Sequence, residues 1–214
     1  PVPTIQPAGW VSVGATVDLV HPTSDGTAVE IVSGDPSAAS LATYDAAAET
    51  QTGRFDVAGV KGIVDHGAGQ VAVADAAGVQ IVDTSTGAST STVQIDGQVQ
   101  GITATSGLNQ DPLYVTYMAV DGPTAAWIST GTDTGGSPSK VTFRLPGDRV
   151  GAIAYDKASM MLHILGTSPA GVDRGSGSRA TVYVMDPAGT NPVSNAVYAH
   201  APLPFDAATH VLDE

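Results

Sequence analysis

Phe55-Asp56-Val57-Ala58-Gly59, followed by Ile63-Val64, shows the pattern that decides the fold: a short strand, a junction of small residues, then an apolar strand. The same order occurs four more times along the chain. The other copies are Trp10-Val11-Ser12-Val13-Gly14 before Val17-Asp18-Leu19-Val20, Val93-Gln94-Ile95-Asp96-Gly97 before Val99 and Ile102, Phe143-Arg144-Leu145-Pro146-Gly147 before Val150 and Ile153, and Val197-Tyr198-Ala199-His200-Ala201 before Leu203 and Phe205. Junction positions 14, 59, 97, 147 and 201 are therefore 45, 38, 50 and 54 residues apart.

Two further strands separate successive junctions. The first follows a turn, as in Asp25-Gly26 before Ala28-Val29-Glu30-Ile31-Val32, and turn residues before a β-branched run indicate a hairpin. The second ends in a polar turn, most clearly in Val79-Gln80-Ile81-Val82-Asp83-Thr84-Ser85-Thr86-Gly87, where Asp83 can accept hydrogen bonds from the backbone that follows it. Each repeat thus holds four short strands in roughly 40–50 residues, which is typical of a β-propeller blade. A β-sandwich is the alternative, but a recurring junction argues against it.

The two ends of the chain indicate how such a ring closes. Thr4-Ile5-Gln6 and Trp10–Val13 form the second half of a blade, and Leu203–Phe205 with His210–Leu212 form the first half. We therefore predict one domain over residues 1–214, an all-β propeller of five four-stranded antiparallel blades whose last blade is closed by both termini. Closure would remove exposed sheet edges. A fragment of a six- to eight-bladed ring is the alternative.

Composition excludes several classes of function. The 214 residues include 21 acidic and 8 basic side chains, a net charge of −13, so clustered cations for nucleic-acid phosphates are lacking. There is no cysteine for disulfides or thiolate metal sites. No apolar run approaches the roughly 18–20 residues that span a bilayer, so we expect no direct membrane insertion by this segment. The proline-rich start, Pro1–Pro7, is typical of a linker and suggests excision from a larger protein.

The repeats resemble the YVTN and lactonase-like class of bacterial β-propellers. The likeness is carried by His21-Pro22-Thr23-Ser24-Asp25-Gly26, by Leu113-Tyr114-Val115-Thr116, and by Ile81–Gly87 with its Asp-x-x-x-Gly ending. It covers nearly the whole chain. The resemblance implies the propeller fold and leaves activity open, because one fold hosts many functions.

Ligands of propellers commonly bind at the mouth of the central channel, which the starts of the innermost strands surround. The candidate ligand-binding residues at these positions are Asp18, Lys61, Gln98, Gln100, Asp148 and Arg149. Hydrolytic propellers need paired carboxylates near this axis, and Asp18, Asp148 and Asp206 show no such pattern. We predict no catalytic residues.

The histidines indicate no metal centre. His21 and His66 follow the innermost strands of successive blades, with Asp65 adjacent, and we interpret them as surface turn residues because further ligands at that level are lacking. His163 interrupts an apolar strand and is expected to be a hydrogen-bonded sheet residue. Gly175–Ala180 matches G-x-G-x-x-A, but a strand follows where a dinucleotide site needs a helix. We therefore predict no metal and no cofactor.

Two hypotheses for function remain. The first is a non-catalytic, extracytoplasmic binding or interaction module of a larger bacterial protein, with a protein or carbohydrate ligand. Its parent would be similar to membrane-embedded glycosyltransferases of the protein-mannosyltransferase type, some of which carry Gly/Ala/Thr-rich propeller tails. The second is a lactonase-like or glycoside-acting enzyme that uses the central channel.

Overall fold

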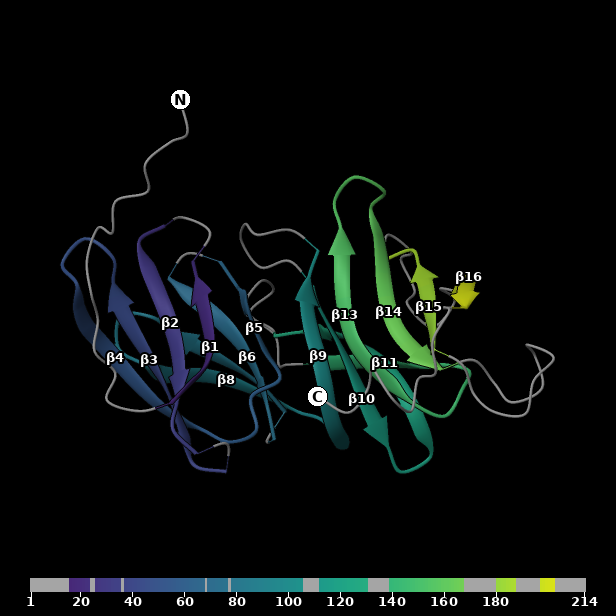
Figure 1. The fold of residues 1–214 in the computed structure, drawn as a ribbon, viewed down its shortest axis with the longest axis horizontal. Helices are drawn as coiled ribbons and strands as arrows, with labels where there is room; N and C mark the ends of the chain where they lie inside the picture. The colour runs from purple at the N-terminus through teal and green to yellow at the C-terminus, as the bar shows by residue number, and fades with distance from the viewer. Residues whose placement is uncertain are drawn as a thin grey trace.

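The computed structural model describes residues 16–23, 26–35, 37–67, 69–76, 78–105, 112–130, 139–167 and 180–187, together with the backbone of 197–202. Within this part of the chain every regular element is a β-strand (Figure 1). No helix there is long and apolar enough to cross a membrane. The predicted strands Thr4–Gln6, Trp10–Val13, Leu203–Phe205 and His210–Leu212 lie outside the described residues.

In the described part of the chain, sixteen strands form four antiparallel sheets, each with its strands in sequence order. Sheet 1 contains β1 (Val17–Pro22), β2 (Ala28–Ser33), β3 (Ala39–Asp45) and β4 (Thr50–Val57). Sheet 2 contains β5 (Gly62–Asp65), β6 (Gln70–Asp75), β7 (Gly78–Asp83) and β8 (Ala88–Gln94). Sheet 3 contains β9 (Gly97–Ala104), β10 (Leu113–Ala119), β11 (Gly122–Ser129) and β12 (Ser139–Arg144). Sheet 4 contains β13 (Val150–Asp156), β14 (Met161–Thr167), β15 (Ala180–Met185) and β16 (Val197–Pro202).

The sheets confirm the four-strand repeat: Gly59 and Gly147 lie between the fourth strand of one sheet and the first strand of the next, and Gly97 begins β9. Gly14 lies outside the described residues, and Ala201 lies within β16. The polar turns form as predicted. Asp83 Oδ1 accepts hydrogen bonds from the backbone N–H groups of Ser85 (2.9 Å) and Thr86 (3.0 Å), and Asp45 Oδ1 does the same for Ala47 and Ala48 at 2.8 and 2.7 Å. These short local bonds close the hairpins between the third and fourth strands of sheets 1 and 2.

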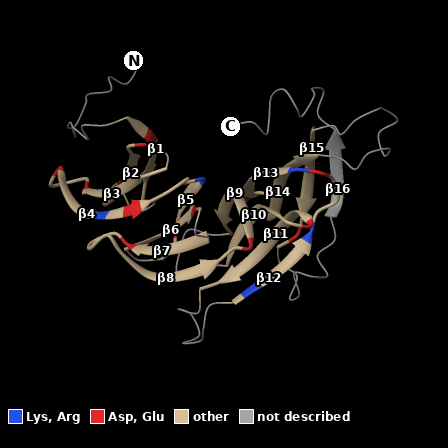
Figure 2. Cartoon of the chain, turned by 90° about the horizontal axis from the view of Figure 1, so that it is seen from below, with Lys and Arg blue, Asp and Glu red and all other residues tan. Residues whose placement is uncertain are grey.

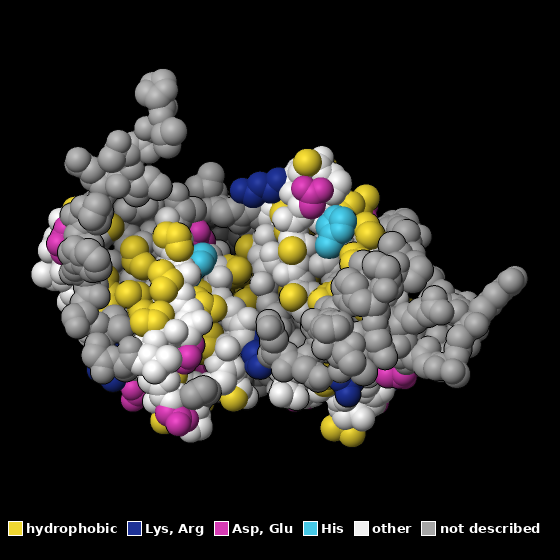
Figure 3. Space-filling model, in the orientation of Figure 1, with side chains coloured by type: hydrophobic (Ala, Val, Ile, Leu, Met, Phe, Trp, Pro, Cys, Tyr) yellow, Lys and Arg dark blue, Asp and Glu magenta, His cyan; other side chains and the backbone are white. Residues whose placement is uncertain are grey.

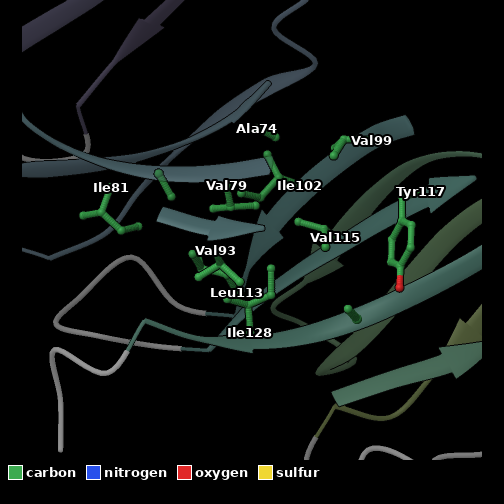
Figure 4. Packing of buried hydrophobic residues seen from close by; sticks show 12 residues of the cluster. Ala74, Val79, Ile81, Val93, Val99, Ile102, Leu113, Val115, Tyr117 and Ile128 are labelled. Atoms are coloured by element: carbon green, nitrogen blue, oxygen red, sulfur yellow. The ribbon is translucent and has the colours of Figure 1, made fainter. Parts of the chain in front are cut away.

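A core lies between each pair of successive sheets. Val32 and Leu41 of sheet 1 pack with Ile63 and Val71 of sheet 2 in the first core. The second core joins sheets 2 and 3 through side chains such as Ile81, Leu113 and Ile128 (Figure 4). The third core joins sheets 3 and 4. Burial of both faces of β6 and β10 shows that sheets 2 and 3 each pack between two neighbours.

The four sheets follow one another along an arc, with first strands on the inner side and fourth strands on the outer side (Figure 2). Contacts between β1 and β5, β5 and β9, and β9 and β13 confirm that the first strands are neighbours. This is a β-propeller-like, all-β repeat architecture. Among the described residues, strand pairing does not join sheet 4 back to sheet 1.

Candidate functional site

Five of the six predicted binding residues lie at or just before the starts of the first strands, and Gln100 is the fourth residue of β9. Gln100 is half-buried, and the other five are exposed: Asp18, Lys61, Gln98, Asp148 and Arg149. Because β1, β5, β9 and β13 are neighbours, the other five residues lie at one end of the inner strands, with Gln100 farther along β9. Their role in binding stays a prediction.

The backbone at this end is held in place from the neighbouring strand. Thr167 Oγ1 accepts hydrogen bonds from the N–H groups of Asp148 (2.9 Å) and Arg149 (3.0 Å), and the Thr167 N–H donates to the Arg149 carbonyl at 3.1 Å. Gly147 precedes them at φ +114, where a Cβ atom would overlap the Thr167 carbonyl oxygen. The turn that presents Asp148 and Arg149 therefore depends on a glycine and on one threonine hydroxyl.

Formal charges balance within the six predicted residues, although the chain as a whole is acidic. Asp18 and Asp148 are offset by Lys61 and Arg149, and Gln98 and Gln100 add two neutral amides. The Gln100 amide Nε2 donates to the Gln98 carbonyl at 3.3 Å, which orients one of these amides along β9. Such a surface offers hydrogen-bond donors and acceptors without a strong net field.

A second polar cluster lies at the opposite, carboxyl-terminal ends of β1 and β5. His21 Nε2 and Asp65 Oδ1 are 3.4 Å apart, with side chains 23% and 17% exposed. Glu30 lies directly opposite His21 in the β1–β2 register and is fully buried. Thr43, opposite Glu30 on β3, donates its hydroxyl to Glu30 Oε2 at 2.9 Å. Three strands of sheet 1 and one of sheet 2 therefore contribute to this cluster.

Glu30 has the most perturbed carboxyl group of the described residues. The pKa of Glu30 is raised from 4.5 to about 7: burial is the largest cause, the hydrogen bond from Thr43 lowers the pKa in part, and the negative charge of Asp65 adds to the rise. No hydrogen-bond donor among the described residues reaches Glu30 Oε1. An ionised Glu30 therefore has a hydrogen bond from the described residues to Oε2 and none to Oε1.

Two interpretations of histidines were wrong. His66 is buried, 4% exposed, and its Nε2 lies 3.1 Å from Thr130 Oγ1, so it is an interior residue and not a surface turn residue. His163 Nε2 is buried without a hydrogen-bond partner among the described residues, where a bonded sheet histidine was expected. The error on His66 arises because burial between sheets depends on how blades pack, which local sequence does not show. His163 is half-buried, on the face of β14 that points away from sheet 3.

Sequence reasoning also missed Glu30. A signal was present, because Glu30 shares a strand face with the apolar Ala28 and Val32 at alternate positions of β2. A charged residue on the inward face of a strand is a candidate for a functional or strained position. The described part of the chain nevertheless contains no group of three or more His, Cys, Asp or Glu side chains able to hold a metal ion.

Comparisons with known proteins support the fold alone. No family model and no curated protein matches the sequence. A functionally unknown protein from Desulfotomaculum acetoxidans DSM 771 has a similar structure, with a TM-score of 0.62, 14% sequence identity, and coverage of 89% of this chain and 57% of that one. The tricorn protease aligns with a TM-score of 0.37 and 17% identity over 89% of this chain and 21% of its own. This chain thus spans less than two thirds of either protein.

Proposed function

We propose that the chain is a non-catalytic binding module built as a closed five-bladed propeller. The fifth blade would combine the two terminal segments, residues 1–15 and 203–214, between sheets 4 and 1. Ring closure would place the starts of the first strands around one channel mouth and so turn six separate polar residues into one binding surface.

Burial at the two end sheets supports closure. In sheet 4, Leu162 and Ile164 face sheet 3 and are buried, whereas the alternate residues Met161, His163 and Leu165 are only half-buried. In sheet 1, the residues of β2 alternate in the same way, and Val20 on β1 is 56% exposed. Hydrophobic side chains gather over sheet 1 on the side shown in Figure 3. An apolar sheet face of this kind needs a cover, and a further blade supplies one.

The balanced charge of the candidate mouth supports an uncharged polar ligand. Each hydroxyl of a neutral sugar both donates and accepts hydrogen bonds. The two amides, two carboxylates and two cationic groups of the candidate mouth supply partners for both roles. We therefore propose a carbohydrate ligand in preference to a protein one. We place the module on the extracytoplasmic side, as the soluble part of a membrane-embedded glycosyltransferase of the protein-mannosyltransferase type. The cysteine-free composition, in which only 14% of residues are charged, is compatible with that location.

The experiment is a titration of ¹⁵N-labelled protein with α-mannobiose, followed by amide chemical shifts. We expect shifts confined to the starts of β1, β5, β9 and β13. The double variant Gln98→Ala/Gln100→Ala should weaken binding about tenfold or more, because two hydrogen-bonding amides are lost. Gln51→Ala, which changes an exposed glutamine on the outer strand β4, is the matched control and should bind normally.

Two results would contradict the proposal. Absence of shifts at these strand starts, at millimolar sugar, would remove the carbohydrate ligand. Turnover of model lactones or glycosides that the Gln98→Ala/Gln100→Ala variant abolishes would show an enzyme in place of a binding module.

A further inference from the structure

Glu30 lies in the core between sheets 1 and 2 and not on the binding surface proposed above. It shares its face of β2 with Val32, which packs against sheet 2 with Ile63 and Val71. Glu30 is 0% exposed, and its Oε1 has no hydrogen-bond partner among the described residues. A buried carboxylate in this state is costly, while the neutral acid is tolerated, so protonation of Glu30 favours the packed interface.

Charged groups face Glu30 from two elements. His21 is opposite it on β1, and Asp65 of β5 is close enough for its charge to act on Glu30. Strand β3 contributes the Thr43 hydroxyl, while its Asp45 binds the backbone of its own turn. Strand β6 presents Val71 and Val73 to this core, and its Asp75 accepts hydrogen bonds from Gly78 and Gln80. His21 and Asp65 thus link β1 to β5 beside the buried acid.

We propose that Glu30, with His21 and Asp65 beside it, forms a proton-operated latch that holds sheet 1 against sheet 2 more tightly in acid than at neutral pH. A proton on Glu30 removes the buried negative charge and its repulsion with Asp65. Protonation of Glu30 therefore tightens the contact between the two sheets.

The direction of the pH dependence follows from proton linkage. In the open or unfolded state Glu30 titrates near its ordinary pKa of 4.5, and in the packed state its pKa is about 7. The packed state therefore binds one more proton between these values. The equilibrium constant that favours the packed over the open state is highest below pH 4.5. It falls about tenfold per pH unit up to pH 7 and levels off above pH 7.

A single buried thiol can measure this opening, because the chain contains no cysteine. Val32→Cys places a thiol in the core between sheets 1 and 2, where Val32 is 2% exposed. Its labelling rate with a dipyridyl disulfide, divided by the rate of the unfolded protein at the same pH, gives the opening equilibrium. Val115→Cys, in the core between sheets 2 and 3, is the matched control.

We expect protection of Cys at position 32 to fall about tenfold per pH unit from pH 5 toward pH 7, and protection at position 115 to stay constant. Addition of Glu30→Gln should abolish the slope at position 32, whereas Glu49→Gln, at an exposed turn, should leave it unchanged. A slope that survives Glu30→Gln overturns the proposal. Equal slopes at positions 32 and 115 also overturn it, because they would report global unfolding.

A measurement on the natural sequence covers the case in which Glu30→Gln does not fold. The chain has three glutamates, so selective ¹³C labelling of their carboxyl groups gives three resolvable titrations. We expect one of them near pH 7, moved to still higher pH by Thr43→Val, since that variant removes the hydrogen bond that favours the ionised form. Three titrations in the ordinary range for glutamate would refute the latch.

Discussion

Thr167 shows how one buried side chain positions the candidate mouth. Its hydroxyl oxygen accepts the N–H groups of both Asp148 and Arg149, so the shape of this turn depends on a residue one strand away. Nothing in the local sequence around Gly147 indicates this partner, which is why the turn could be predicted but its support could not.

Thr167→Val should destabilise the protein by about 1–3 kcal/mol, because two backbone donors lose their acceptor while side-chain volume is kept. Urea unfolding monitored by circular dichroism measures the change. Thr142→Val, at an exposed position of β12, is the control and should alter stability by less than about 0.5 kcal/mol. Equal stability of the two variants would show that the Thr167 bonds contribute nothing.

Glu30 and His66 mark the limit of sequence reasoning at this scale. The position of Glu30 in a strand, and of His66 just after one, could be predicted from apolar alternation and turn residues. Their burial could not, because it arises from contact between residues far apart in the chain, such as His66 with Thr130. Five of the six candidate mouth residues lie at or just before the strand starts, a position that needs only strand order to predict, and their role in binding stays a prediction.

At the scale of elements, the strands and hairpins were largely predictable. The run Ala28–Val32 became β2 with one further residue, and the run Val79–Val82 lies within β7. Residues 46–49 form the turn between β3 and β4, with Glu49 at φ 54. Local patterns sufficed here because period-two alternation and Asp-containing turns act within a few residues.

Close approach between sheets gives an element-scale test. A Cβ atom on Gly53 of β4 would lie 2.6 Å from the backbone nitrogen of Gly87, in the turn between β7 and β8. Gly53→Ala should therefore separate the outer strands of sheets 1 and 2 and cost about 1–3 kcal/mol in unfolding free energy. Thr50→Ala, exposed on the same strand, should have little effect. A stable Gly53→Ala variant in urea unfolding would mean that these backbones do not touch.

At the scale of the whole molecule, the repeat predicts an order of packing that the three cores confirm. Sheets 1 to 4 pack in sequence, and only the two end sheets keep a half-exposed apolar face within the described part of the chain. That asymmetry is the observation from which we propose a ring closed by a fifth blade. Blade number could not be derived from spacing alone, because rings of different size use blades of similar length.

Ring closure is tested most directly by amide–amide nuclear Overhauser effects between the two ends of the chain. Closure pairs the second strand of the fifth blade, His210–Leu212, with its third, Thr4–Gln6. We predict short-range antiparallel cross-peaks between these segments in a dilute monomeric sample, labelled so that intermolecular contacts are filtered out. Absence of these cross-peaks, while both segments remain intact and the four sheets stay folded, would contradict the five-bladed ring.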